Sequence, residues 1–321
     1  MSTAVNYAEE LNALSEASVR KHFQAFVDIP WDDPAYEIVP NDPRWKLPAV
    51  DPLGSHSWYL SQTEERQIEI GLMRQADIAK VGVHFENLLM RGLLTYVVSV
   101  PNGSPEFRYS MHEVTEETHH TQMFQEFVNR TGLDVPGSPR YFQLLGHTAP
   151  LIAVMLPEIF FAAVLLGEEP LDHVQKTILR ATGELHPLIQ RIMQIHVAEE
   201  ARHISFANEF LAKNVPDLNF ARRALLAVLF PLTARMIADV LSPSYKWADM
   251  AGVPRSVIKE LYYNSDDGRD LLAEMFGDVR RLVDRIGLLN SVTRPIWNSL
   301  GVGGRPSRFR GETAEFTAVA E

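Results

Sequence analysis

Residues 196–203 read HVAEEARH, and residues 116–120 read EETHH. In both stretches a Glu precedes a His by three positions, and residues three apart share one face of an α-helix. Such a pair can hold one metal ion. A single match carries little weight in a chain with 11 histidines, but two matches on separate helices are typical of bundles that bind two metal ions between their helices.

The remainder of the chain also favours helices, because no alternating strand pattern of useful length competes with the helical spacing of its apolar residues. Four long stretches are expected to form a bundle, at residues 61–98, 109–131, 141–166 and 187–213. Further helices are expected at residues 7–26, 171–181, 218–241, 255–262 and 267–287, with Gly167 and Pro170 marking a break. The sequence therefore predicts an all-α protein with a ferritin-like four-helix bundle core and additional helices.

The expected domain organisation has three parts. Residues 1–60 form an N-terminal helix followed by a proline-rich, irregular wrap. Residues 61–300 form a single ferritin-like helical domain, and residues 301–321 form a flexible tail.

A bundle that holds two metal ions needs more than the two Glu-x-x-His pairs. In such bundles the other two helices each bring one Glu into the core. The stretches 61–98 and 141–166 meet this requirement, because Glu86 and Glu158 each lie within a stripe of apolar residues. Both are predicted metal ligands.

Periodicity selects the register of the EETHH motif. The face through Glu117 and His120 continues to Phe127, which belongs in a core. The face through Glu116 continues to Arg130, so Glu116 is expected to face water.

In the second motif, His196 shares a stripe with Glu200 and His203 and joins them one turn earlier. The predicted metal ligands are therefore Glu86, Glu117, His120, Glu158, His196, Glu200 and His203. Carboxylates combined with imidazoles suit iron or manganese. The absence of cysteine excludes thiolate ligands and disulfides.

Composition narrows the function further. The net charge of −11 argues against a nucleic-acid partner. The most apolar run, residues 151–167, carries Pro157 and Glu158 at its centre, so it is expected to be a buried helix rather than a membrane span. The first residues show no basic segment followed by an apolar one, which favours a cytoplasmic protein without a membrane partner.

The order of the predicted ligands resembles that of the p-aminobenzoate N-oxygenase family, the AurF-like di-iron oxygenases of the ferritin-like superfamily. The shared pattern is a lone Glu, a Glu-x-x-His, a second lone Glu and a final His-x-x-x-Glu-x-x-His, over roughly residues 62–212. The additional histidine, His196 here, is the specific part of the match. The resemblance implies a homodimer that holds two iron ions, with manganese as a possible substitute, and uses O2 to N-oxygenate an aryl amine.

Two departures accompany this resemblance. The interval from Glu158 to His196 is longer than is usual in the family, and Ile78 stands where family members can have a tyrosine. Nothing in the sequence resembles a flavin, haem or nicotinamide site, so electrons are expected from an external ferredoxin or reductase. No catalytic residue is predicted beyond the metal ligands.

Two other functions remain open at the level of sequence. A di-iron hydroxylase or desaturase would act on C–H bonds of a lipid or a carrier-bound acyl chain. A non-catalytic iron-storage or ferroxidase protein would hold many irons per chain in a multimeric shell.

Overall fold

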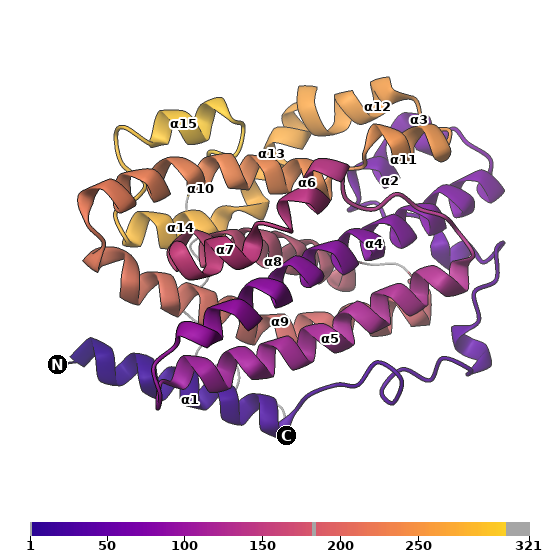
Figure 1. Cartoon of the computed structure of the whole chain (residues 1–321). Helices are drawn as coiled ribbons and strands as arrows, with labels where there is room; N and C mark the ends of the chain where they lie inside the picture. Colours follow the sequence, from indigo (N-terminus) through magenta and orange to yellow (C-terminus); the bar gives the residue numbers. More distant parts are fainter. Residues whose placement is uncertain (1, 182–183, 306–321) are drawn as a thin grey trace.

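The computed structural model describes residues 2–181 and 184–305, and every regular element in these ranges is helical (Figure 1). The predicted all-α fold is confirmed. The bundle consists of α4 (Glu64–Tyr96), α5 (Pro105–Thr131), α8 (Pro157–Arg180) and α9 (Pro187–Asn214). Helix α4 packs along α5 and α8 packs along α9, while α4 also contacts α8 and α5 contacts α9. These four contacts close the bundle around a shared interior.

Local signals set the ends of the bundle helices. The Thr63 side chain accepts a hydrogen bond from the Arg66 amide, and Glu64 in the first turn of α4 interacts favourably with the helix dipole. Helix α5 begins with Pro105, where a missing amide donor costs nothing, and ends at Gly132. Gly132 has φ of 68°, the left-handed conformation that glycine adopts most readily.

Helix α8 departs from the prediction. The helix expected over 141–166 is divided into α6 (Arg140–Leu145), α7 (Ala149–Met155) and the first turns of α8, which then runs on to Arg180. The expected break at Gly167 and Pro170 is wrong. Pro157 takes the first helical position of α8, and Pro170 lies inside the helix, where residues 164–170 are all buried.

The outer helices cover the bundle. Helix α10 (Phe220–Leu241) lies over α8, and α1 (Ser2–Arg20) lies against α5 and α9 (Figure 1). The remaining helices are shorter: α2 (Pro52–Ser55), α3 (Ser57–Leu60), α11 (Tyr245–Met250), α12 (Arg255–Lys259), α13 (Asp266–Met275), α14 (Gly277–Arg285) and α15 (Arg294–Ser299).

The segment between α1 and α4 is tied to the bundle through Trp45. This indole is buried, stacks on the His186 ring at 4.0 Å and packs against Phe127 of α5 at 5.9 Å. At the other end of the chain, most of the tail expected at 301–321 lies outside the described residues.

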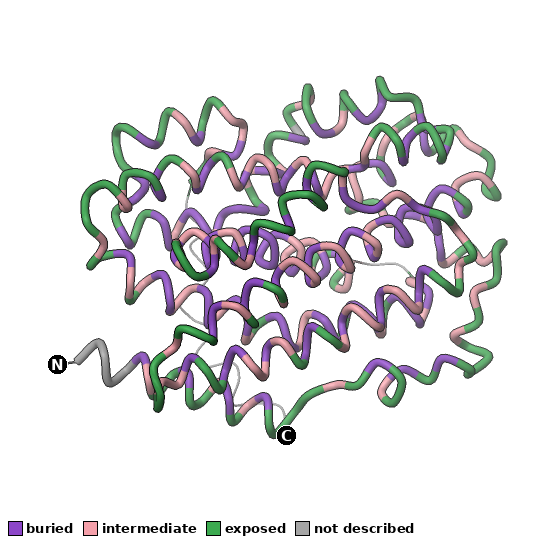
Figure 2. Tube along the Cα trace, in the orientation of Figure 1, coloured by how far each residue is buried: buried purple, intermediate pink, exposed green. Residues whose placement is uncertain are grey.

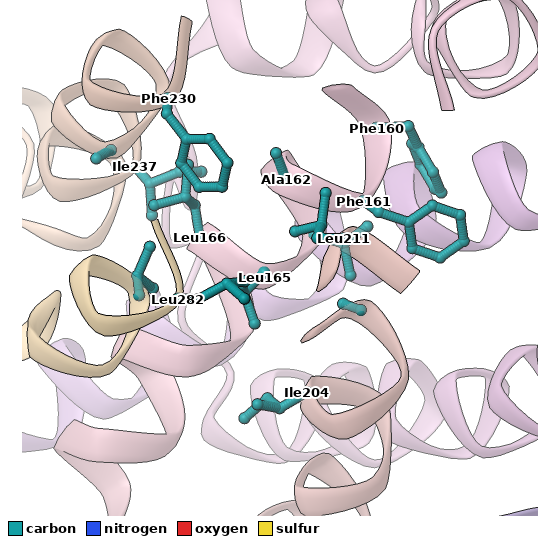
Figure 3. Packing of buried hydrophobic residues seen from close by; sticks show 14 of the residues in the cluster. Phe160, Phe161, Ala162, Leu165, Leu166, Ile204, Leu211, Phe230, Ile237 and Leu282 are labelled. Carbon is teal, nitrogen blue, oxygen red and sulfur yellow. The ribbon is translucent and has the colours of Figure 1, made fainter. Parts of the chain in front are cut away.

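The hydrophobic core fills the space between the bundle and its cover. Buried residues concentrate in the middle of the molecule and exposed ones at its edges (Figure 2). Figure 3 shows one part of this core, a cluster to which Phe161 and Leu165 of α8, Ile204 of α9, Phe230 of α10 and Leu282 of α14 belong. Burial of each such side chain contributes roughly 1.5–3 kcal/mol to folding.

One segment, Phe220–Met250, is long and apolar enough to cross a membrane by length and composition. In this structure 44% of its most apolar window is buried inside the protein. Its first part, α10, packs on α8, and core helices of this kind pass the same test.

Gly92 provides a test of how tightly α4 and α8 pack. A Cβ added at Gly92 would lie 2.1 Å from Cε2 of Phe160, which is buried. We expect Gly92→Ala to lower the free energy of unfolding by about 1–3 kcal/mol, although alanine favours helices over glycine by about 1 kcal/mol. Urea unfolding followed by circular dichroism measures this.

The control is Gly146→Ala. Its added Cβ would come no closer than 3.2 Å to another atom, the Gln143 carbonyl oxygen, so this variant should lose less stability than Gly92→Ala. Equal unfolding midpoints for the two variants would show that the α4–α8 contact is looser than described.

Candidate metal centre

Six of the seven predicted ligands lie together in the middle of the bundle. All six side chains are buried, with at most 1% of their surface exposed. They form two overlapping groups, within each of which one potential ligand atom per residue lies within 4.8 Å of the others. The first group is Glu86, His120, His196 and Glu200, and the second is Glu117, His120, Glu200 and His203.

The distances place carboxylate oxygens between imidazole nitrogens. Glu117 Oε1 lies 2.8 Å from His203 Nδ1, and Glu117 Oε2 lies 3.1 Å from His120 Nδ1. Glu200 Oε1 lies 3.2 Å from His196 Nε2 and 3.5 Å from the Nδ1 atoms of the other two histidines. One nitrogen of each ring therefore faces a common centre.

The other nitrogen of each ring is held by a second side chain. His120 Nε2 lies 2.9 Å from Glu199 Oε2, and His203 Nε2 lies 2.7 Å from Glu116 Oε2. Each of these carboxylates accepts a hydrogen bond from the outer N–H of its ring, which leaves the inner nitrogen as the one that can bind a metal ion.

His196 follows the same scheme with an amide in place of a carboxylate. Its Nδ1 atom lies 2.9 Å from Oε1 of Gln175 on α8. All three imidazoles are thus fixed in orientation with one ring nitrogen turned to the centre, where it can bind a metal ion once its proton is lost.

The first Glu of each motif therefore serves the other motif. Glu116 of α5 binds His203 of α9, and Glu199 of α9 binds His120 of α5. The expectation that Glu116 faces water is wrong, because only 2% of its surface is exposed and Arg202 donates to it at 2.7 Å. The sequence signal that could have predicted these two orienting carboxylates is the pair of consecutive Glu residues in each motif.

Glu158 is the predicted ligand that the structure does not bring to the cluster. It lies in the first turn of α8, where Arg222 Nε donates to Oε1 at 2.7 Å and Arg222 Nη2 donates to Oε2 at 3.0 Å. Glu168, ten positions later on the same helix, lies with Glu86 and Glu117 instead. The error follows from the misplaced helix break, because α8 continues through Pro170 and carries Glu168 into the bundle.

Burial shifts the pKa values in this cluster in opposite directions. It raises the pKa of Glu86 and of Glu168 well above the ordinary value, and neighbouring carboxylates add to both effects. Burial would also raise the pKa of Glu117, but His203 and His120 outweigh it and hold that pKa well below its usual range. Burial opposes charge on His120, yet Glu117 raises its pKa to about 10. At neutral pH Glu86, Glu168 and His120 therefore keep protons unless cations replace them, whereas Glu117 is ionised.

Several inward-facing atoms have no hydrogen-bond partner among the described residues. They are Glu86 Oε2, Glu200 Oε2 and both carboxylate oxygens of Glu168. Unsatisfied buried oxygens are costly, by about 1–3 kcal/mol or more each. A set of oxygen and nitrogen donors aimed at one place fits hard, divalent or trivalent metal ions such as iron or manganese.

A comparison with protein families supports this interpretation. The model of the family described as P-aminobenzoate N-oxygenase AurF matches residues 4–287. The chain belongs to the AurF family. Membership in the AurF family indicates an oxygenase, and the buried His and Glu cluster fits a metal site.

Close relatives of this AurF family member occur in mycobacteria. The uncharacterized protein Rv0885 of Mycobacterium tuberculosis and the uncharacterized protein Mb0909 of Mycobacterium bovis are each 51% identical to this chain over 308 residues. The match covers 95% of this chain and 90% of each relative.

The structure also resolves one departure from the AurF pattern noted in the sequence. With Glu168 in place of Glu158, the interval to His196 is ten positions shorter. The separate helix expected at residues 171–181 is instead the last part of α8, which continues as far as Arg180.

The two glutamates of α8 can be told apart by metal binding. We expect Glu168→Gln to weaken Mn²⁺ binding by more than the roughly 10–100-fold that loss of an outer partner costs, because a direct donor is removed. Titration of the metal-free protein followed by electron paramagnetic resonance measures this affinity.

Glu158→Gln is the matched control and should leave the Mn²⁺ affinity unchanged, because that carboxylate binds Arg222. Normal affinity in Glu168→Gln together with lost affinity in Glu158→Gln would contradict the placement of α8.

The role of Glu116 in orienting His203 can be tested in the same titration. Glu116→Gln keeps the shape of the side chain but removes the charge that holds the His203 proton, so the Mn²⁺ affinity should fall by roughly 10–100-fold. Glu126→Gln on the same helix is the control, because Glu126 only pairs with Arg130 at the surface. Equal affinities in the two variants would show that Glu116 has no part in the site.

Proposed function

We propose that this protein is a non-haem di-iron oxygenase that activates O2 and N-oxygenates an amine. The substrate class that we propose is an aryl amine. The observation that carries the proposal is the convergence of three oriented imidazoles and four buried carboxylates from α4, α5, α8 and α9. Their order along the chain is that of the AurF family, and the family model spans the whole bundle.

In this proposal the two overlapping groups each hold one iron ion. Glu86 and His196 would serve one ion, and Glu117 and His203 the other. Glu200 Oε1 lies within 3.5 Å of all three inward-facing nitrogens and belongs to both groups, so Glu200 would help to hold both ions. Glu168 completes the set from the α8 side.

When bound, the iron ions supply Lewis acidity and the redox capacity for oxygen chemistry. The chain's own residues contribute geometry. Glu116, Glu199 and Gln175 hold the three imidazoles in one tautomer and one orientation. Phe124, whose ring centroid lies 5.1 Å from that of His196, keeps one side of the site apolar and free of water.

The electron donor, the cellular location and the oligomeric state are proposed from the resemblance to the AurF family. Electrons would come from an external ferredoxin or reductase, and the protein would act as a cytoplasmic homodimer. Manganese could take the place of iron, because the donor set of carboxylates and imidazoles suits both metals.

The test is a single-turnover reaction with isotopically labelled oxygen. Iron-loaded protein is reduced chemically, mixed with a panel of aryl amines under ¹⁸O2, and the products are analysed by mass spectrometry. We expect ¹⁸O on nitrogen, at the hydroxylamine, nitroso or nitro level, with two irons bound per chain. Glu117→Gln is the inactive control.

Two outcomes would overturn the proposal. Label appearing only on carbon, with aryl amines or with acyl substrates, would identify a hydroxylase or desaturase. Many irons per chain in a large shell, without an oxidised organic product, would identify iron storage.

A further inference from the structure

A small cavity lies between α4, α8 and α10, outside the cluster of ligands. It encloses about 20 Å³. Its walls are entirely apolar, and the wall residues that matter here are Ile78, Gly82 and Phe85 of α4, Gly167 and Leu171 of α8, and Ile237 of α10. No charged or hydrogen-bonding side chain lines it among the described residues.

The inner end of the cavity lies next to the ligand-bearing turns. Phe85 directly precedes Glu86, and Gly167 directly precedes Glu168. Gly82 lies against the ring of Phe124, since a Cβ at Gly82 would lie 2.9 Å from that ring. The Phe124 ring also neighbours His196, so it lies against both Gly82, which lines the cavity, and one of the proposed ligands.

The outer end of the cavity lies toward the surface. Ile78, Leu171 and Leu241 are half-buried, whereas Gly82, Phe85 and Gly167 are buried. The three half-buried residues form the side of the cavity called its mouth here, and Phe85 and Gly167 connect its lining to the turns that carry two of the proposed ligands.

The size of the cavity decides what it can hold. A water molecule needs roughly 10–15 Å³ of such volume and two to four polar partners, whereas a cavity that binds benzene measures about 150 Å³. The cavity here, at about 20 Å³, has room for one very small molecule but offers water no partner and has no room for an aryl ring.

The nearest buried cation gives no reason to expect an anionic guest. Arg74 lies one turn before Ile78, but its guanidinium donates to the Leu241 carbonyl at 2.9 Å and lies 3.9 Å from Asp77. It also lies over the Trp247 ring at 5.9 Å. A carboxylate entering the cavity would find no free positive group on its walls.

We propose that this cavity is a holding site for molecular oxygen beside the metal cluster, and that the amine reaches the cluster by a different route. The inference rests on the proposed function for its biological meaning, because only an oxygen-using centre needs such a site. The physical claim, that a small apolar gas accumulates here, stands on the cavity alone.

The first test measures oxygen directly and needs no activity. The full-length, metal-free protein is labelled at Ile, Leu and Val methyl groups, and its nuclear magnetic resonance spectra are recorded under nitrogen and under raised O2 pressure. Paramagnetic relaxation by O2 should be several-fold greater at the Ile237 methyls than at the methyls of Val253 and Ile258, which are equally buried in another core cluster. Equal relaxation at both sets would overturn the proposal.

The second test fills the cavity. Leu171→Phe places a ring in the mouth, whereas Leu179→Phe makes the same change at another half-buried position of α8 away from the cavity. The first variant should lose the excess relaxation at Ile237 and raise the KM for O2 several-fold with an unchanged KM for the amine. The second should match the unaltered protein in both respects. Leu241→Phe, which fills the cavity from α10, takes the place of Leu171→Phe if the latter does not fold.

The two proposals fail in different ways. Oxygen accumulation without amine oxidation would leave the gas site standing and remove the proposed reaction. Amine oxidation with uniform relaxation, or with an unchanged KM for O2 in the filled variants, would leave the reaction standing and remove the gas site.

Discussion

Charge compensation inside an apolar bundle is the constraint on which this structure depends. Glu86, Glu117, Glu168 and Glu200 are buried together, and each isolated buried charge would cost several kcal/mol. Three imidazoles and their partners offset part of this cost, and metal ions would offset the remainder. The long bundle helices are thus held at distances set by an ionic centre, while the apolar side chains around it supply the bulk of the folding energy.

The outer carboxylates give the site its rigidity. Glu116 and Glu199 bind the outer nitrogens of His203 and His120, and Arg202 donates to Glu116 at 2.7 Å. A ring held on one side by a carboxylate can present only one nitrogen on the other, so the inward geometry does not depend on side-chain rotation. Family membership and this geometry point in the same direction, toward oxygen chemistry at a metal centre.

Much of this could be predicted from the sequence, because helical periodicity places residues three and four apart on one face. With that rule, six of the seven residues predicted as ligands are ones that the structure places in the central cluster. It failed for Glu158 because the assignment of that residue depended on where a helix ends, and Pro157 and Pro170 could each begin or break one. It failed for Glu116 because periodicity along one helix contains no information about a partner helix, and the residues that neutralise Glu116 both lie on α9.

The exchange of carboxylates between α5 and α9 means that neither motif is self-sufficient. A Glu-Glu-x-x-His segment transplanted by itself into another bundle would carry a histidine whose orienting acid stayed behind and an acid with no ring to orient. Substitutions at Glu116 and His203, or at Glu199 and His120, are accordingly best treated as changes to one unit that spans two helices. The effects of substitutions at such a pair are therefore expected to be non-additive, although the two positions lie about eighty residues apart in the chain.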